Sequence, residues 1–255
     1  MLLIFKILLV PTMIAAISIA GRIWGPRVSG LLAGFPVTVG PVLVFLAIDH
    51  GQDFAVSSAE AALAGVISIG LFCSVYAASS QRYGILTSLI LGVLGFAVST
   101  FFFSVVHLSL IVTALTVISV LIMLLLAFPE YGVASVNRQA SSYDIPFRMI
   151  AAASLVLVIT YSSEFLGPRL SGLFAPFPIA GTILAGFTHF NNGSEAARRL
   201  LDGFLRGLFG MAAFTFIFAS QLSNLGIWLT TIVAGLLAVF SISISKRWTR
   251  HPTVL

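Results

Sequence analysis

Two copies of one short motif contain the residues of this chain best suited to bind a small molecule. Residues 25–36 read GPRVSGLLAGFP and residues 167–178 read GPRLSGLFAPFP, so nine of twelve positions are identical at an offset of 142. Guanidinium groups bind carboxylate or phosphate, hydroxyl groups form hydrogen bonds, and proline frees backbone groups of a helix. The candidate substrate-binding residues are Arg27, Ser29, Pro36, Thr38, Arg169, Ser171, Pro178 and Thr182.

The prolines predict an interrupted helix in each half. Pro36 and Pro178 fall inside apolar spans, where proline removes a backbone hydrogen bond and kinks or breaks the helix. Backbone groups freed at membrane depth must face protein, water or substrate. Paired interruptions at matching positions of two halves point to the binding site of a transporter. The alternative is that both prolines are packing kinks.

The residues between the arginine and the proline predict how each helix begins. Ser29 and Ser171 are expected to be N-caps that accept hydrogen bonds from free backbone N–H groups. The small residues Gly30 and Ala33 would let a neighbouring helix approach closely.

Each arginine of the motif precedes a helix N-terminus, where the helix dipole is already positive, so each needs an anion. An internal carboxylate is one candidate, and a lipid phosphate or an anionic substrate is the alternative. The internal partners predicted by the topology are Glu195 or Asp202 for Arg27, and Asp53 or Glu60 for Arg169.

Motifs for catalysis and for cofactor binding are missing from the sequence. It contains no GxSxG, HExxH, Walker or dinucleotide-binding pattern, its four histidines are far apart, and Cys73 is its single cysteine. We therefore expect no enzyme activity, no metal and no cofactor. Acidic residues in the middle of a span are also missing, which disfavours proton antiport.

The composition predicts an all-α polytopic membrane protein. Apolar residues make up 59% of the chain and charged residues 8%, whereas a soluble domain carries about 25% charged residues. This excludes a soluble, disordered or disulfide-stabilised fold. About nine transmembrane helices are expected, near 2–20, 30–48, 60–78, 84–105, 108–128, 146–163, 172–190, 203–221 and 225–244.

Two features of the charge pattern support this count. Residues 84–128 contain no charged residue and would form a helix about 67 Å long, twice the bilayer thickness, so the chain must turn near Ser104, His107 and Ser109. Nine spans also place eleven of the 13 basic residues on or near one face. That face is predicted to be cytoplasmic, with the N-terminus outside and the C-terminus inside.

The repeat divides the chain into two halves joined by one helix. Its offset also pairs Gly51 with Gly193 and Glu60 with Asp202. We expect a first four-helix repeat over 1–106, a linker helix and loop over 107–143, and a second repeat over 144–255. Because five spans separate equivalent positions, the two repeats of this 4+1+4 arrangement are expected to be inverted across the membrane.

The stretch from Gly25-Pro26-Arg27 through LLAGFPVTVGPVLVFLAIDHG resembles small bacterial membrane proteins of the DUF3147 type. Each of those proteins is similar to one half of this chain. The resemblance implies a bacterial inner-membrane protein and no established activity. The general architecture is similar to transporters with crossed, broken helices, such as the bile-acid/sodium symporter class.

These observations predict a secondary or facilitative transporter of a small solute, with its site between the two broken helices. The alternatives are a channel, or a non-transporting membrane protein such as an assembly factor or lipid-binding scaffold. The expected partners are the solute and membrane lipids and no nucleic acid, and a homodimer is left open.

Overall fold

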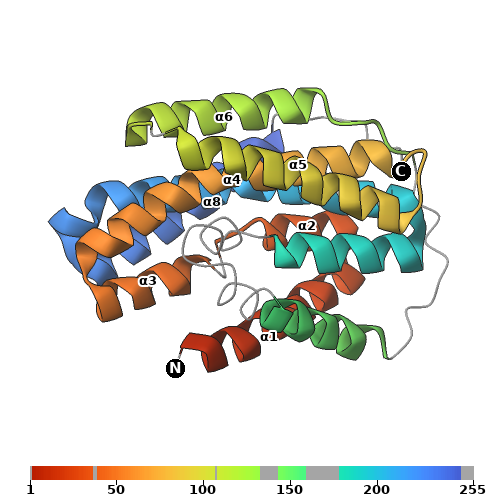
Figure 1. The fold of residues 1–255 in the computed structure, drawn as a ribbon, viewed down its shortest axis with the longest axis horizontal. Helices are drawn as coiled ribbons and strands as arrows, with labels where there is room; N and C mark the ends of the chain where they lie inside the picture. Colours follow the sequence, from red (N-terminus) through yellow and green to blue (C-terminus); the bar gives the residue numbers. More distant parts are fainter. Residues whose placement is uncertain (1, 37–38, 107, 133–142, 159–177, 248–255) are drawn as a thin grey trace.

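The computed structural model describes residues 2–36, 39–106, 108–132, 143–158 and 178–247 (Figure 1). Every regular element in these residues is an α-helix, which confirms the all-α prediction. The helices are α1 (Leu2–Trp24), α2 (Pro26–Ala33), α3 (Val39–His50), α4 (Gln52–Ser79), α5 (Ile85–Val105), α6 (Leu110–Leu126) and α8 (Ile179–Arg247), and residues 144–158 are also helical.

Single glycines join consecutive helices without a loop. Gly25, Gly51, Gly193 and Gly226 have φ values of 92°, 88°, 83° and 72°, a backbone region that favours glycine. A helix resumes directly after each of them. The last two therefore divide α8 into segments 179–192, 194–225 and 227–247.

The helix boundaries repeat at the offset found in the sequence. The second and third segments of α8 start 142 residues after α4 and α5, and α8 ends 142 residues after α5. Gly51 and its equivalent Gly193 share one backbone conformation. The sequence repeat is therefore also a repeat of helices and joints.

Two hydrophobic clusters follow the same repeat. The smaller one includes Ala55 and Ala59 from the start of α4, packed with Phe214 and Phe218 from the middle segment of α8. The equivalent residues Ala197, Leu201, Phe72 and Tyr76 all belong to the larger cluster. The first turns of α4 thus pack with the later part of the middle segment of α8, and the first turns of that segment pack with the later part of α4. These two helices run antiparallel to each other (Figure 1).

Three helices in the described part of the chain are long and apolar enough to cross a membrane, namely Gln52–Ser79, Ile85–Val105 and the kinked stretch Ile179–Ser241. The prediction of nine separate spans is met only in part. The interruption after α2 leaves α3 with 12 residues, and Leu8–Trp24 and Leu110–Leu126 are also shorter apolar helices.

Two helices begin earlier than the predicted spans 60–78 and 203–221. Because Gly51 and Gly193 leave no loop, α4 starts at Gln52 and the middle segment of α8 starts at residue 194. The acidic residues Asp53 and Glu195 consequently lie in first helical turns, where the helix dipole favours negative charge. The predicted turn between 104 and 109 is present, since α5 ends at Val105 and α6 begins at Leu110; His107 lies outside the described residues.

Candidate functional site

Helix α2 lies in backbone contact with the middle segment of α8. A Cβ atom on Gly30 would lie 1.7 Å from the Leu200 carbonyl oxygen, and one on Gly203 would lie 2.0 Å from the Arg27 carbonyl oxygen. Gly34 and Gly207 meet in the same way one turn further along. Two GxxxG patterns therefore interlock, which confirms the close approach predicted at Gly30. We call these contacts the glycine interlock.

The predicted break is present in the first half. Helix α2 ends at Ala33 and α3 begins at Val39. The Gly40 amide donates to the Pro36 carbonyl at 2.8 Å, and the Thr182 amide donates to the Pro178 carbonyl at the same distance. Pro36 and Pro178 thus lie at equivalent helix starts rather than at kinks within a helix. The residues before Pro178 lie outside the described part of the chain.

Both helix starts pack on phenylalanine rings of the opposite repeat. A Cβ on Gly40 would lie 3.2 Å from the Phe214 ring, and one on Gly181 would lie 3.1 Å from the ring of the equivalent Phe72. The Gly181 position also faces the Phe204 ring at 2.7 Å, while the Phe204 backbone contacts the interlock glycines of α2. Phe204 therefore lies between α2 and the start of α8.

One predicted site residue offers an unused polar group at these helix starts. The Thr182 hydroxyl oxygen is buried, and no hydrogen-bond partner for it is found among the described residues. An unpaired polar atom away from water is costly unless a ligand or water completes it. Thr38, Arg169 and Ser171 lie outside the described residues, so their predicted roles stay predictions.

Arg27 forms one of the internal ion pairs predicted from the topology. Its Nε lies 3.0 Å from Asp202 Oδ2, and Asp202 also binds Arg206 at 2.9 Å and accepts a hydrogen bond from the Tyr131 hydroxyl at 3.1 Å. The Asp202 side chain is 4% exposed and that of Arg27 is 46% exposed. Along α2, Arg27 is about 9 Å from Ala33, so it lies at the far end of α2 from the helix break. The alternative predicted partner, Glu195, pairs with Arg198.

The prediction that Ser29 is an N-cap is wrong. Gly25 occupies the N-cap of α2 and Pro26 its first turn, where proline is favoured. Because the positive φ of Gly25 lets the helix begin early, Ser29 lies inside α2. Ser29 is 3% exposed. A Cβ atom added to Gly21 of α1 would lie 2.8 Å from the Ser29 Cβ. Ser29 is a contact between α1 and α2.

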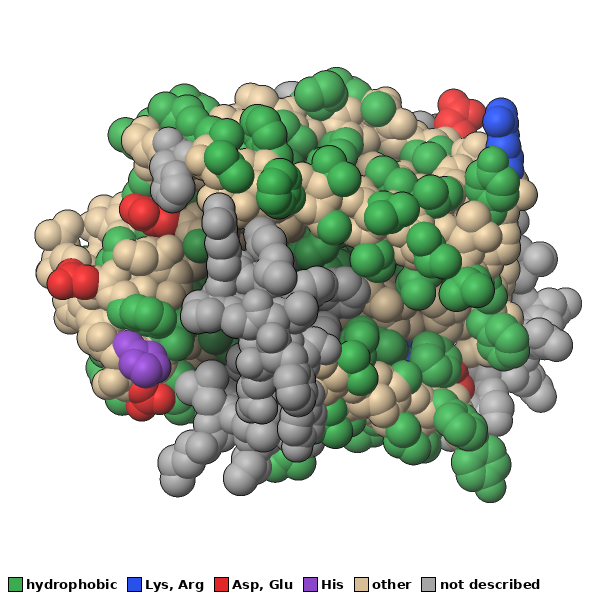
Figure 2. Space-filling view, in the orientation of Figure 1, with side chains coloured by type: hydrophobic (Ala, Val, Ile, Leu, Met, Phe, Trp, Pro, Cys, Tyr) green, Lys and Arg blue, Asp and Glu red, His purple; other side chains and the backbone are tan. Residues whose placement is uncertain are grey.

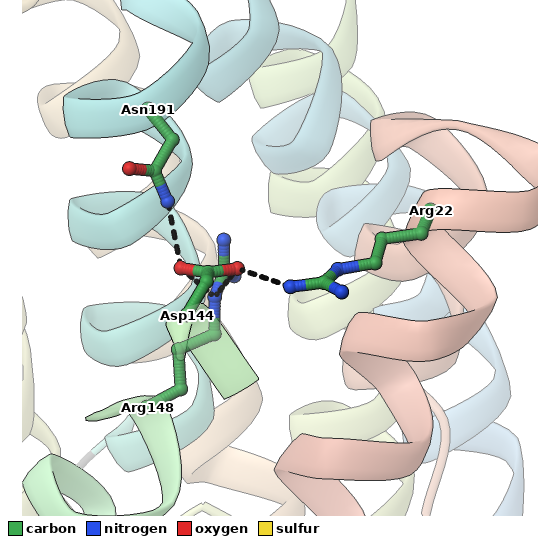
Figure 3. A network of polar contacts seen from close by, with 4 residues as sticks. All are labelled: Arg22, Asp144, Arg148 and Asn191. Carbon is green, nitrogen blue, oxygen red and sulfur yellow. Dashed lines mark hydrogen bonds and ion pairs between the residues drawn. The ribbon is translucent and has the colours of Figure 1, made fainter. Parts of the chain in front are cut away.

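A second carboxylate network joins three elements and was missed by sequence reasoning (Figure 3). Asp144 binds Arg22 of α1 at 3.3 Å and Arg148 at 3.0 Å, and it accepts a hydrogen bond from Asn191 of α8 at 2.7 Å. The Arg148 guanidinium also lies 5.4 Å from the centre of the Phe187 ring. The four-residue spacing of Asp144 and Arg148 was the available signal, but it does not reveal partners on other helices.

The environment of Tyr131 favours its neutral form. Burial raises the pKa of the Tyr131 phenol, and the neighbouring Asp202 carboxylate raises this pKa further. The hydroxyl therefore stays a hydrogen-bond donor to Asp202 at neutral pH. Within the described residues, no group of three or more His, Cys, Asp or Glu side chains is arranged to hold a metal ion.

Comparison with known proteins adds no relative. No family model matches the sequence, and no curated protein or solved structure shows significant similarity to it. The resemblance to the DUF3147 type stays a prediction from the residues quoted for it.

Proposed function

We propose that this chain is a secondary or facilitative transporter of a small solute in the bacterial inner membrane, with its site at the two helix starts. The observation behind this proposal is the matched pair of starts after Pro36 and Pro178, each packed on a ring of the opposite repeat. Paired helix interruptions at equivalent positions of two halves are typical of transporter binding sites. The buried Thr182 hydroxyl, which has no partner among the described residues, is the polar group that a solute at this helix start would use.

The proposed architecture has nine spans in a 4+1+4 inverted repeat. The antiparallel course of α4 and the middle segment of α8 supports it, because these helices are repeat equivalents. Inverted halves related by a pseudo-two-fold axis let one half rock against the other around a fixed site. The proposed crossings include the shorter apolar helices and the three α8 segments.

The distribution of charge supports the proposed orientation. On the described part of the face shown in Figure 2, hydrophobic side chains are widespread, and the charged side chains visible there lie mainly toward the two ends. Five arginines from distant segments form ion pairs with carboxylates on either side of the Gly193 joint. They are Arg22, Arg27, Arg148, Arg198 and Arg206. We call this end of the molecule the basic end and propose that it is cytoplasmic, since cytoplasmic loops are rich in basic residues.

A thermal-shift screen of the purified protein against fractionated metabolites tests this function. A ligand at a hundred times its Kd stabilises the folded state by about 2.7 kcal/mol. We expect a stabilising compound that also accumulates in proteoliposomes containing the protein. Thr182→Ala should weaken its binding, because the buried hydroxyl is lost. The matched variant Thr116→Ala, whose exposed hydroxyl donates to the Val112 carbonyl of its own helix, should not.

Three outcomes would contradict the proposal. A compound that stabilises both threonine variants like the wild type would place its site away from the helix starts. A compound that binds without accumulating would favour the lipid-binding scaffold. If no fraction stabilises the protein, the helix starts do not form a metabolite site.

A further inference from the structure

Two arginines and a tryptophan lie where α1 meets α2, at the basic end. Arg22 and Trp24 belong to the last turn of α1, and Arg27 belongs to the first turn of α2. Gly25, with its φ of 92°, is the single residue between the two helices. Trp24 is 65% exposed, and the Arg27 side chain is 46% exposed. We call residues 22–27 the α1–α2 joint.

The ion pair of Arg27 leaves part of its guanidinium to serve an anion. Its Nε lies 3.0 Å from Asp202, and the described residues provide no hydrogen-bond acceptor for its two terminal nitrogens. Asp202 is already neutralised by Arg206, whose Nε donates to both carboxylate oxygens at 3.1 and 3.0 Å. Arg27 is therefore a second cation on one carboxylate, and these three side chains together carry a charge of +1.

A second group of the same composition meets the joint from the other helix. Asp144 is shared by Arg22 and Arg148 (Figure 3). In each group the more exposed arginine belongs to the joint, since Arg22 and Arg27 are 35% and 46% exposed, whereas Arg148 and Arg206 are 8% and 5% exposed. The positive charge of both groups is therefore nearest to the surface at the joint.

The start of α2 adds to this positive potential. Its first turn contains no acidic residue, and no side chain caps it. The positive end of the helix dipole thus lies beside the Arg27 guanidinium. A phosphate or carboxylate is the kind of group that both would attract.

Exposed apolar side chains adjoin these arginines and indicate which anion binds. Ile23 is 64% exposed and Trp24 is 65% exposed. Tryptophan is enriched at the membrane–water interface, where its ring meets the hydrocarbon and its N–H meets the headgroups. Guanidinium donors beside exposed apolar side chains match a molecule with both a phosphate and acyl chains, rather than a free phosphate.

The backbone that carries Arg27 is fixed before any ligand binds. The Arg27 carbonyl contacts Gly203 in the glycine interlock, and Gly21 of α1 packs on Ser29 of α2. A binding group on a fixed backbone loses less conformational freedom on association. The joint is therefore a preformed surface for a lipid headgroup.

We propose that the α1–α2 joint binds an anionic phospholipid in the leaflet at the basic end. The Arg27 guanidinium donates to the phosphate oxygens, and Ile23 and Trp24 contact the glycerol and the acyl chains. Arg27 lies at the far end of α2 from the helix break, so this lipid site is separate from the helix starts. The inference rests on the proposed membrane location and not on the transport of a solute.

Quenching of Trp24 fluorescence by brominated lipids tests the site. Trp24 becomes the single tryptophan after Trp228→Phe and Trp248→Phe. The protein is reconstituted into mixed bilayers of phosphatidylglycerol and phosphatidylcholine, with bromine in the acyl chains of one lipid at a time. We expect phosphatidylglycerol to be favoured about fivefold at Trp24, which is the contribution of one basic residue near an anionic membrane surface.

Two variants remove the preference by different routes. Arg27→Gln removes the guanidinium and should lower the preference to about onefold. Pro26→Glu keeps the Arg27–Asp202 pair and places a carboxylate in the first turn of α2. The helix dipole favours an acid there, so the fold is kept while the phosphate is repelled.

The matched control is Arg82→Gln, at an exposed arginine in the turn between α4 and α5. Arg82 lies near the same end of the molecule, because Tyr76 in the last turns of α4 bonds to His189, four residues before the Gly193 joint. This variant loses the same charge elsewhere and should keep the fivefold preference.

Several results would overturn the lipid site and leave the transport function intact. They are equal quenching by both lipids, a preference that persists in Arg27→Gln or in Pro26→Glu, and a preference that Arg82→Gln abolishes as completely as Arg27→Gln. Loss of the preference in inorganic phosphate at constant ionic strength would identify a soluble phosphate as the ligand instead. Absence of quenching by either lipid would contradict the membrane location itself, and hence the proposed function.

Discussion

Replacing Gly30 by alanine tests whether the glycine interlock fixes α2 on α8. The new Cβ would lie 1.7 Å from the Leu200 carbonyl oxygen and 2.8 Å from the Phe204 amide nitrogen. A normal carbon–oxygen contact is about 3.3 Å. The two helices would therefore have to separate by about 1.6 Å, and the obstacle is helix backbone that cannot rotate aside.

The expected cost combines two opposing terms. Overpacking typically costs about 1–3 kcal/mol, and the upper end applies here because backbone must move. Alanine gains about 1 kcal/mol over glycine in a helix interior. We therefore expect Gly30→Ala to lower the free energy of unfolding by about 2 kcal/mol, and the Tm by about 4–8 °C for a chain of this size.

Thermal unfolding of the detergent-solubilised protein, followed by circular dichroism, measures the effect. Gly186→Ala is the matched control, because it lies inside α8 with nothing within 4 Å of its added Cβ. The control should be neutral or more stable by up to about 1 kcal/mol. If Gly30→Ala unfolds at the same temperature as Gly186→Ala, the backbone contact between α2 and α8 does not exist.

Two further substitution sets test the ion pair and the glycine joints. In a double-mutant cycle, Arg27→Ala and Asp202→Asn should couple by about 0.5–3 kcal/mol in unfolding free energy, whereas additive effects would mean that the 3.0 Å pair contributes nothing. Gly226→Ala should cost about 1–3 kcal/mol because its φ is 72°. The equivalent Gly84→Ala, with φ −70° and equally open space, should be neutral or stabilising in the same melts. Equal Tm values for the two glycine variants would rule out strain at Gly226.

Part of the site was predictable because its signals are local or follow from the repeat. Proline lacks a backbone donor wherever it stands, so the break near Pro36 could be predicted without any contact. The pairing of Arg27 with an acid of the second half followed from the repeat and from the number of spans between them. The structure selects Asp202 over Glu195, because Glu195 is engaged by Arg198 and Gly132.

Helix boundaries at the glycine joints were less predictable. The apolar runs predicted spans at 60–78 and 203–221, whereas the helices begin at Gln52 and residue 194. A positive φ at Gly51 or Gly193 leaves no signal in the sequence, because glycine adopts it as readily as other conformations. The wrong N-cap prediction at Ser29 has the same cause, because Gly25 also has a positive φ.

The sequence by itself determined the helical character, the presence of helices apolar enough to cross a membrane, the repeat and the break at Pro36. These properties depend on composition and on residues close together along the chain. Only the tertiary structure decided which acid each arginine meets. Asp144 binds Arg22 across 122 positions, and Gly132 binds Glu195 across 63. Such contacts depend on how the helices pack, and α2 takes its place on α8 because four glycines leave room for its backbone.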